Sequence, residues 1–248
     1  MDNDIKLFKQ VYHLTADQCN PQQEMPMSLL VSKIIDVATL HANAWGVGYD
    51  RLVRDNQGWV LTRLTVEMRR MPRVNEHYSL STWIVEYNRH FSVRHMEIAD
   101  EQGTILGYAS TIWCVIDFTT RVSVDITKLE YISRNALPTK QCPIAPQRRM
   151  TNITPTRTAT HEFTYTDCDI NSHVNTVRYV ELLLNQFDLD FHRGFFAHRL
   201  EMSFVKECRY HNQAIVVIDD NAMNDCRLDI VVDETPRVRA RISFAPRE

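Results

Sequence analysis

The sequence lacks the long apolar runs and the basic leader that mark membrane or exported proteins. Its longest apolar stretches, such as residues 111–116, fall far short of the roughly 20 residues that a membrane-spanning helix needs. The first residues, Met1 to Asp4, carry acid where a secretory signal or transit peptide carries positive charge. We therefore expect a cytoplasmic protein without a membrane span.

The sequence also lacks ligand-like spacings of cysteine and histidine. None of the six cysteines forms a Cys-x-x-Cys pair, and none of the ten histidines forms a His-x-x-x-His or His-Glu-x-x-His pattern. The 28 basic residues are offset by 31 acidic ones, which gives a formal charge of −3, and no long basic run is present. We expect no disulfide, no metal, no organic cofactor and no nucleic-acid partner.

The sequence contains the same order of predicted secondary-structure elements twice. An extended segment (8–14), a helical run (28–45) and four strand-like segments (59–71, 78–88, 92–100 and 105–118) come first. In the helical run, apolar side chains and a histidine recur at three- and four-residue intervals: Leu30, Ile34, Val37, Ala38 and His41. After an irregular stretch with prolines, the order repeats as a strand (158–164), a helix (174–187) and strands at 199–210, 214–219, 227–233 and 238–244.

The residues echo this repetition at an offset of 136 positions. Gly58 to Leu64 resembles Gly194 to Leu200, and the same offset pairs Arg73 with Arg209. Internal duplication explains the echo, although alternation in two amphipathic strands can create one by chance. A single helix followed by antiparallel strands is buried most simply when the sheet curls around the helix. Two such units can pair their exposed sheet edges, so we predict an α+β fold of two tandem units.

The stretch from Asp167 to Tyr179 is the richest in chemistry. Asp169, Asn171 and His173 are spaced by two, so an extended turn would project all three side chains from one side of the backbone. The positive end of the following helix disfavours a protonated imidazole, and a neutral ring can accept a proton. Free N–H groups at that helix end could stabilise an oxyanion. The alternative is that Asp, Asn and Ser only cap the helix, which is their usual role.

The same stretch resembles the signature of acyl-(acyl carrier protein) thioesterases, the plant and bacterial enzymes that end fatty-acid synthesis. A second block, Leu200 to Cys208, is similar to that family's downstream Arg/Lys-Glu-Cys segment. In the first half, Gly58 to Arg63, Pro72 and Thr82-Trp83 are similar to its Trp-x-x-Thr-Arg and Thr-Trp blocks. The resemblance covers most of the chain and implies a double hotdog. We assign 1–135 to a unit with the acyl-chain pocket, 136–155 to a linker and 156–248 to a catalytic unit.

The resemblance implies that Asp169, Asn171 and His173 are catalytic, with Glu207 or Cys208 joining from the adjacent strand. Neighbours on a strand face opposite sides, so a carboxylate that helps water attack and a cysteine nucleophile are competing alternatives. The apolar even positions 200, 202 and 204 favour burying Cys208, but Lys206 breaks the pattern and a bulge could reverse it. We favour the water route because a buried, unactivated cysteine is inert.

The first half lacks these candidate catalytic residues, since Met71 and Pro72 stand where Glu207 and Cys208 would fall at the offset of 136. The resemblance implies that this half holds the acyl chain, and the candidate lining residues are Trp59, Leu61 and Trp83, which plain core packing would also explain. The implied partner is acyl carrier protein with a phosphopantetheine-linked acyl chain, and two basic clusters could steer it: Arg69, Arg70 and Arg73, or Arg148 and Arg149.

Three alternatives stay open from the sequence. A coenzyme A thioesterase of the same fold would use identical chemistry and differ only in docking. A non-catalytic acyl-binding protein would not require acid, amide and imidazole together, and fold alone does not decide function. The chain could be a monomer or a homodimer, and neither chain length nor saturation preference follows from the residues.

Overall fold

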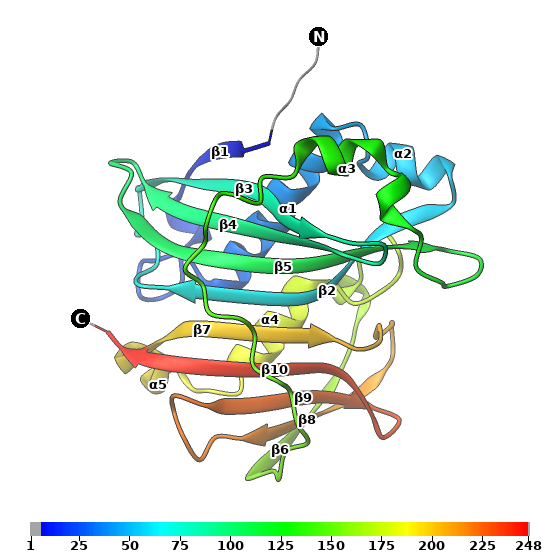
Figure 1. The fold of residues 1–248 in the computed structure, drawn as a ribbon. Helices are drawn as coiled ribbons and strands as arrows, with labels where there is room; N and C mark the ends of the chain where they lie inside the picture. Colours follow the sequence, from blue (N-terminus) through cyan, green and yellow to red (C-terminus); the bar gives the residue numbers. More distant parts are fainter. Residues whose placement is uncertain (1–5, 248) are drawn as a thin grey trace. The chain divides into compact units, whose positions relative to one another are not determined.

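The structure is a computed structural model that describes residues 6–247 (Figure 1). Met1 to Asp4, on which the expectation about leader peptides rests, lie outside the described residues. The chain divides into two compact units, Met1–Met25 with Lys33–Ala145 and Pro26–Ser32 with Pro146–Glu248. Within residues 6–247, every helix is too short or too polar to cross a membrane.

The first unit is a five-stranded antiparallel sheet with one long helix. Its strands are β1 (Phe8–His13), β2 (Gln57–Met68), β3 (His77–Tyr87), β4 (Ser92–Asp100) and β5 (Ile105–Asp117), and they lie in the order β1-β3-β4-β5-β2. The long helix is α1 (Met27–Ala44), which belongs to this unit from Lys33 onwards, and the short elements are η1 (Ala16–Gln18), α2 (Tyr49–Arg54), η2 (Ile126–Lys128) and α3 (Glu130–Asn135). All five positions of the predicted helical stripe are buried, which confirms the periodicity.

Side chains hold α1 against this sheet. The hydroxyl of Tyr12 on β1 donates to the carboxylate of Asp36 on α1 at 3.0 Å. Nη1 of the buried Arg94 on β4 lies 2.7 Å from Nδ1 of His41, near the other end of the helix. The helix is therefore fixed to the edge strand β1 and to the central strand β4, as expected for a sheet that wraps a helix.

The second unit repeats this topology with a shorter helix. Its strands are β6 (Arg157–Glu162), β7 (Phe195–Phe204), β8 (Gln213–Asp219), β9 (Cys226–Val232) and β10 (Thr235–Pro246), in the order β6-β8-β9-β10-β7. Its helices are η3 (Tyr165–Asp167), α4 (Thr176–Leu184) and α5 (Leu189–Gly194). Position by position, this order equals that of the first unit. The ends of β2 and β7, Met68 and Phe204, are also 136 residues apart, which supports duplication.

Two elements of the second unit differ from the sequence prediction. The helix predicted over 174–187 is shorter and spans Thr176–Leu184. The strand predicted over 199–210 ends at Phe204, because the N–H groups of Val205 and Lys206 both donate to the carbonyl of Arg237, at 2.8 and 3.2 Å. Because two successive N–H groups share one carbonyl, the regular hydrogen-bond pattern between the strands ends here, and residues 205–208 leave the sheet.

The stretch between the units forms no helix or strand over residues 138–155, yet it is bound to both sheets. In the first unit, the indole N–H of Trp83 donates to the carbonyl of Lys140 at 3.1 Å. In the second unit, Gln147 donates to Ser203 on β7 at 3.0 Å, and Arg239 on β10 donates to Asn152 at 2.9 Å. The linker segment is thus an ordered strap on each sheet rather than a free tether.

Candidate active site

The turn that carries the predicted catalytic residues is tight rather than extended. The N–H of Asp169 donates to the carbonyl of His173 at 2.8 Å, and the N–H of Ser172 donates to the carbonyl of Asp169 at 3.0 Å. Ser172 has a φ of 59°, in the left-handed region that the chain uses to reverse sharply. The predicted projection of three side chains from an extended turn is therefore wrong.

Asp169 supports this turn with its carboxylate. Its Oδ1 accepts the N–H groups of Asn171, at 2.8 Å, and of His173, at 3.3 Å. Asp169 thus stabilises the turn itself, whereas the helix-capping role that the sequence left open is filled for α4 by Asn175, which accepts the N–H of Val177 at 2.9 Å. The side chain of Asn171 is exposed and makes no hydrogen bond to another described residue, so its amide is available to a ligand.

His173 and Glu207 are brought together from two segments. The N–H of Val174 donates to the carbonyl of Cys208 at 2.9 Å, and His173 pairs with Arg209 in an isolated antiparallel bridge. This pairing places Nε2 of His173 3.7 Å from Oε1 of Glu207, with side-chain exposures of 25% and 28%. The separation is too long for a hydrogen bond but short enough for a carboxylate to attract a protonated imidazole, and water can reach both groups.

Cys208 points the other way, into the core. Its side chain is fully buried, and its backbone N–H donates to the hydroxyl of Tyr179 on α4 at 3.0 Å. Burial raises the pKa of the Cys208 thiol, although the hydrogen bond from the Tyr179 hydroxyl opposes that shift. The thiol therefore stays protonated and weakly nucleophilic near neutral pH.

Tyr179 ends the stretch that carries the family resemblance, but the sequence did not predict it as a site residue. Its ring is buried between Phe163 and Phe204, with centroids 5.7 and 6.3 Å away, and burial raises the pKa of its hydroxyl. Because it accepts the N–H of Cys208, this hydroxyl fixes the residue next to Glu207. The available signal was a tyrosine on the apolar face of the helix that follows the polar turn, since a buried tyrosine hydroxyl usually finds a polar partner.

The residues predicted to line an acyl-chain pocket lie on two strands of the first unit, Trp59 and Leu61 on β2 and Trp83 on β3. Trp59 packs against the apolar cluster that includes Ala42 and Leu52, and its indole N–H donates to the carbonyl of Val47 at 2.9 Å. Trp83 lies under the ammonium group of Lys140, 4.7 Å from the ring centroid. Its neighbour on β3, Thr82, accepts from Arg94 at 3.1 Å, and Arg94 also contacts His41 on α1. Alternation along β3 therefore turns Trp83 away from α1.

Leu61, the third of these residues, is buried. Buried side chains at these positions fit plain core packing as well as a pocket wall. The acyl-binding role of Trp59, Leu61 and Trp83, and the pocket assigned to residues 1–135, remain predictions.

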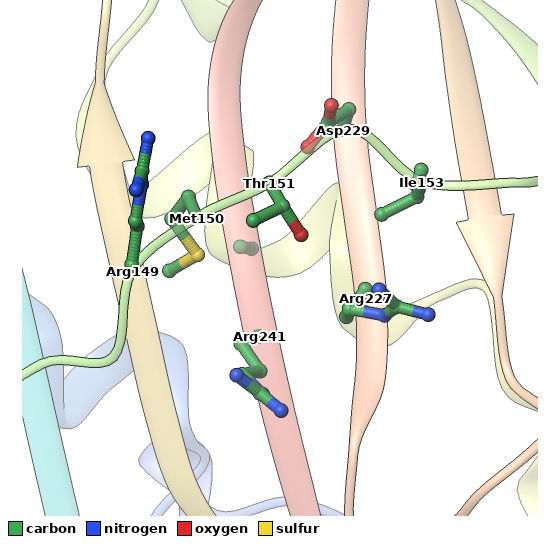
Figure 2. A pocket seen from close by; sticks show the side chains of 8 residues that line it. Arg149, Met150, Thr151, Ile153, Arg227, Asp229 and Arg241 are labelled. Carbon is green, nitrogen blue, oxygen red and sulfur yellow. The ribbon is translucent and has the colours of Figure 1, made fainter.

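A small hollow in the second unit lies elsewhere, where residues 149–153 of the strap cross β9 and β10. Arg149, Thr151, Arg227, Asp229 and Arg241 are among the residues that line it (Figure 2). The guanidinium groups point in different directions instead of converging on one spot. Arg227 and Arg241 are also ion-paired, with Asp219 and Asp225 respectively. None of the predicted catalytic residues borders this hollow.

The two repeated units, each a helix wrapped by an antiparallel sheet, define an α+β double hotdog. The model for the acyl-ACP thioesterase N-terminal domain matches residues 5–133, and that for the acyl-ACP thioesterase C-terminal domain matches residues 152–245. This chain belongs to the acyl-ACP thioesterase family.

Individual relatives are distant in sequence. A chloroplastic acyl-[acyl-carrier-protein] hydrolase of Cuphea viscosissima is 20% identical, and a chloroplastic palmitoyl-acyl carrier protein thioesterase of Gossypium hirsutum is 22% identical. The alignments cover 88% and 97% of this chain, which spans only 56% and 64% of the lengths of these curated relatives. The crystal structure of an acyl-ACP thioesterase from Bacteroides thetaiotaomicron is 27% identical, with a TM-score of 0.88, and the match covers 99% of this chain and 100% of that one.

Proposed function

We propose that this protein hydrolyses the thioester of fatty acyl-acyl carrier protein, releases the free fatty acid and so ends fatty-acid synthesis. The observation that carries the proposal is the pair formed by His173 and Glu207, with Nε2 and Oε1 3.7 Å apart. Family membership supplies the substrate class. The first unit has no equivalent pair, because Met71 stands at the position that corresponds to Glu207.

In this mechanism water is the nucleophile. His173 takes a proton as the water oxygen attacks the thioester carbonyl, and Glu207 stabilises the imidazolium that forms. The exposed amide of Asn171 donates to the carbonyl oxygen as it gains negative charge. The intermediate then expels the carrier thiolate, which recovers the proton from His173, leaving a fatty acid and a free thiol.

Asp169 acts by positioning in this scheme. Its carboxylate holds the N–H groups of Asn171 and His173, and so fixes the turn that carries both side chains. The sequence pattern also suggests that Asp169 polarises water together with Glu207. Its contacts favour the positioning role, while Glu207 is the carboxylate that faces the imidazole.

Cys208 supports the fold rather than the chemistry. Its buried thiol has a raised pKa, and no described contact joins it to His173. A cytoplasmic location fits the proposal, since all six cysteines are free thiols, as is usual in a reducing compartment.

The test is a panel of acyl-carrier-protein and acyl-coenzyme A thioesters of varied chain length. We expect turnover of carrier-bound substrates, and replacement of His173 by alanine should lower kcat by roughly 10² to 10⁴. His161→Ala, a change of the same type on β6, is the matched control and should leave kcat nearly unchanged. Hydrolysis of coenzyme A thioesters alone would favour the rival carrier. Binding of acyl groups without hydrolysis would favour an acyl-binding protein.

A further inference from the structure

Exposed apolar side chains gather around the proposed site. Among the described large apolar residues, Tyr165 and Ile170 are the two most exposed, at 84% and 79%. Val205 and Tyr210 are also exposed, at 58% and 52%. These four residues, here called the rim, lie in the two segments that supply His173 and Glu207. Large apolar groups exposed at this level, and concentrated in one place, indicate a surface that contacts something else.

Backbone hydrogen bonds join the two rim segments. The N–H of His211 donates to the carbonyl of Phe163 at 2.9 Å, and the N–H of Val174 donates to the carbonyl of Cys208, also at 2.9 Å. Tyr165 and Tyr210 therefore flank one of these contacts, while Ile170 and Val205 flank the other. The two segments that carry the rim residues are thus hydrogen-bonded to each other, and the same two segments carry His173 and Glu207.

Carboxylates and cations both lie near the rim, and the two exposed cations have no ion pair within the part of the chain that the structure describes. Oε1 of Glu162 lies 2.6 Å from Nδ1 of His211, and the carboxylate of Asp167 accepts from the N–H and hydroxyl of Thr164. Lys206 and Arg209 are exposed, and neither has an ion pair with another described residue. An apolar patch edged by unpaired cations is complementary to an apolar patch edged by carboxylates.

We propose that the rim is the surface on which the acyl carrier protein docks, with apolar contacts to its four side chains and with Lys206 and Arg209 facing carboxylates of the carrier. The inference rests on the proposed function, because a thioester borne by a protein reaches this site only if that protein touches the surface around it. It places docking at the rim, and not at the arginine clusters 69–73 or 148–149 that the sequence suggested.

The structure also weakens one of those clusters. Arg70 is ion-paired with Glu76 at 2.8 Å and with Asp100 at 3.5 Å, so part of that positive charge is already offset within the first unit. Arg69 and Arg73 are exposed and remain the rival surface. They supply a control that reverses the same number of charges.

The experiment measures binding separately from hydrolysis. The full chain is titrated with carrier protein that bears a non-hydrolysable acyl amide, and the dissociation constant is determined. One variant carries Tyr165→Ser with Ile170→Ser, and a second carries Lys206→Glu with Arg209→Glu. The controls are Val122→Ser, which removes an apolar side chain that is 62% exposed in the first unit, and Arg69→Glu with Arg73→Glu. Circular dichroism and thermal unfolding confirm that each variant is folded.

Each rim variant should raise the dissociation constant about tenfold or more, and each control by less than about twofold. Unchanged binding by folded rim variants overturns the proposal, as does an equal loss in the Arg69/Arg73 control. A fall in molecular mass by sedimentation, or loss of binding to anionic vesicles, with carrier affinity unchanged would assign the rim to a second copy or to a lipid surface instead. Rim-dependent carrier binding without any hydrolysis would leave docking intact and refute the proposed function.

Discussion

Replacement of Glu207 by glutamine tests the centre of the mechanism, because it removes a charge and keeps the shape. Two unit charges about 4 Å apart attract with about 4 kcal/mol at an effective dielectric constant of about 20. The side chains of His173 and Glu207 are 25% and 28% exposed, so solvent weakens the attraction. Taking about half of it gives ~2 kcal/mol, which corresponds to a fall in kcat of about 30-fold.

The assay is initial-rate release of free fatty acid from acyl-carrier protein, with kcat and KM determined separately. The loss should fall on kcat, since the charge on His173 develops only during reaction. Glu162→Gln is the matched control, because Glu162 also faces a histidine, His211, at 2.6 Å, but outside the site. Combining Glu207→Gln with His173→Ala should cost little more than His173→Ala alone. Full additivity, or wild-type kcat in Glu207→Gln, would refute the coupling.

Three further outcomes follow from the site and its support. Cys208→Ala should keep kcat within about threefold and lose about 1 kcal/mol of unfolding free energy; nearly complete loss of turnover in a folded variant would restore the cysteine nucleophile. Tyr179→Phe leaves the N–H of Cys208 without its acceptor, so denaturant titration should show a loss of about 1–3 kcal/mol, with a lower kcat, and wild-type stability would contradict this contact. Burial first, and then nearby carboxylates, raise the pKa of Cys226 from 9.0 to about 11. Its stabilising contribution is complete below pH 9 and is lost as pH rises towards 11, by about 2–3 kcal/mol. Between pH 9 and 11, the free energy of unfolding should therefore fall less steeply with pH in Cys226→Ala than in the wild type. The same slope in both proteins would argue against the raised pKa.

The spacing of apolar residues predicted the long helices and strands well, because the residues at these spacings are the ones that the fold buries. The stripe on α1 and the four following strands appear within a few residues of their predicted bounds, as does the repeated order in the second half. The six-residue helices α2, α3 and α5 were missed, since fewer than two turns hardly establish a helical period.

The sequence yields candidate site residues, whose roles remain predictions, but it does not give the geometry that the structure shows. The motif indicated His173, but the turn around it depends on a positive φ at Ser172 and on Asp169 accepting two N–H groups, neither of which alternation reveals. The choice between Glu207 and Cys208 was left open by a strand argument. The structure instead settles their directions through contacts outside that strand, with His173 on one side and Tyr179 on the other.

The burial of Cys208 has a consequence for resistance to oxidation. Peroxides react with thiolates, and a buried thiol whose pKa is raised presents almost none. The sulfur next to Glu207, the proposed catalytic carboxylate, is therefore protected from conversion to sulfenic acid. Activity should then survive oxidant exposure that modifies the more accessible cysteines of the same chain.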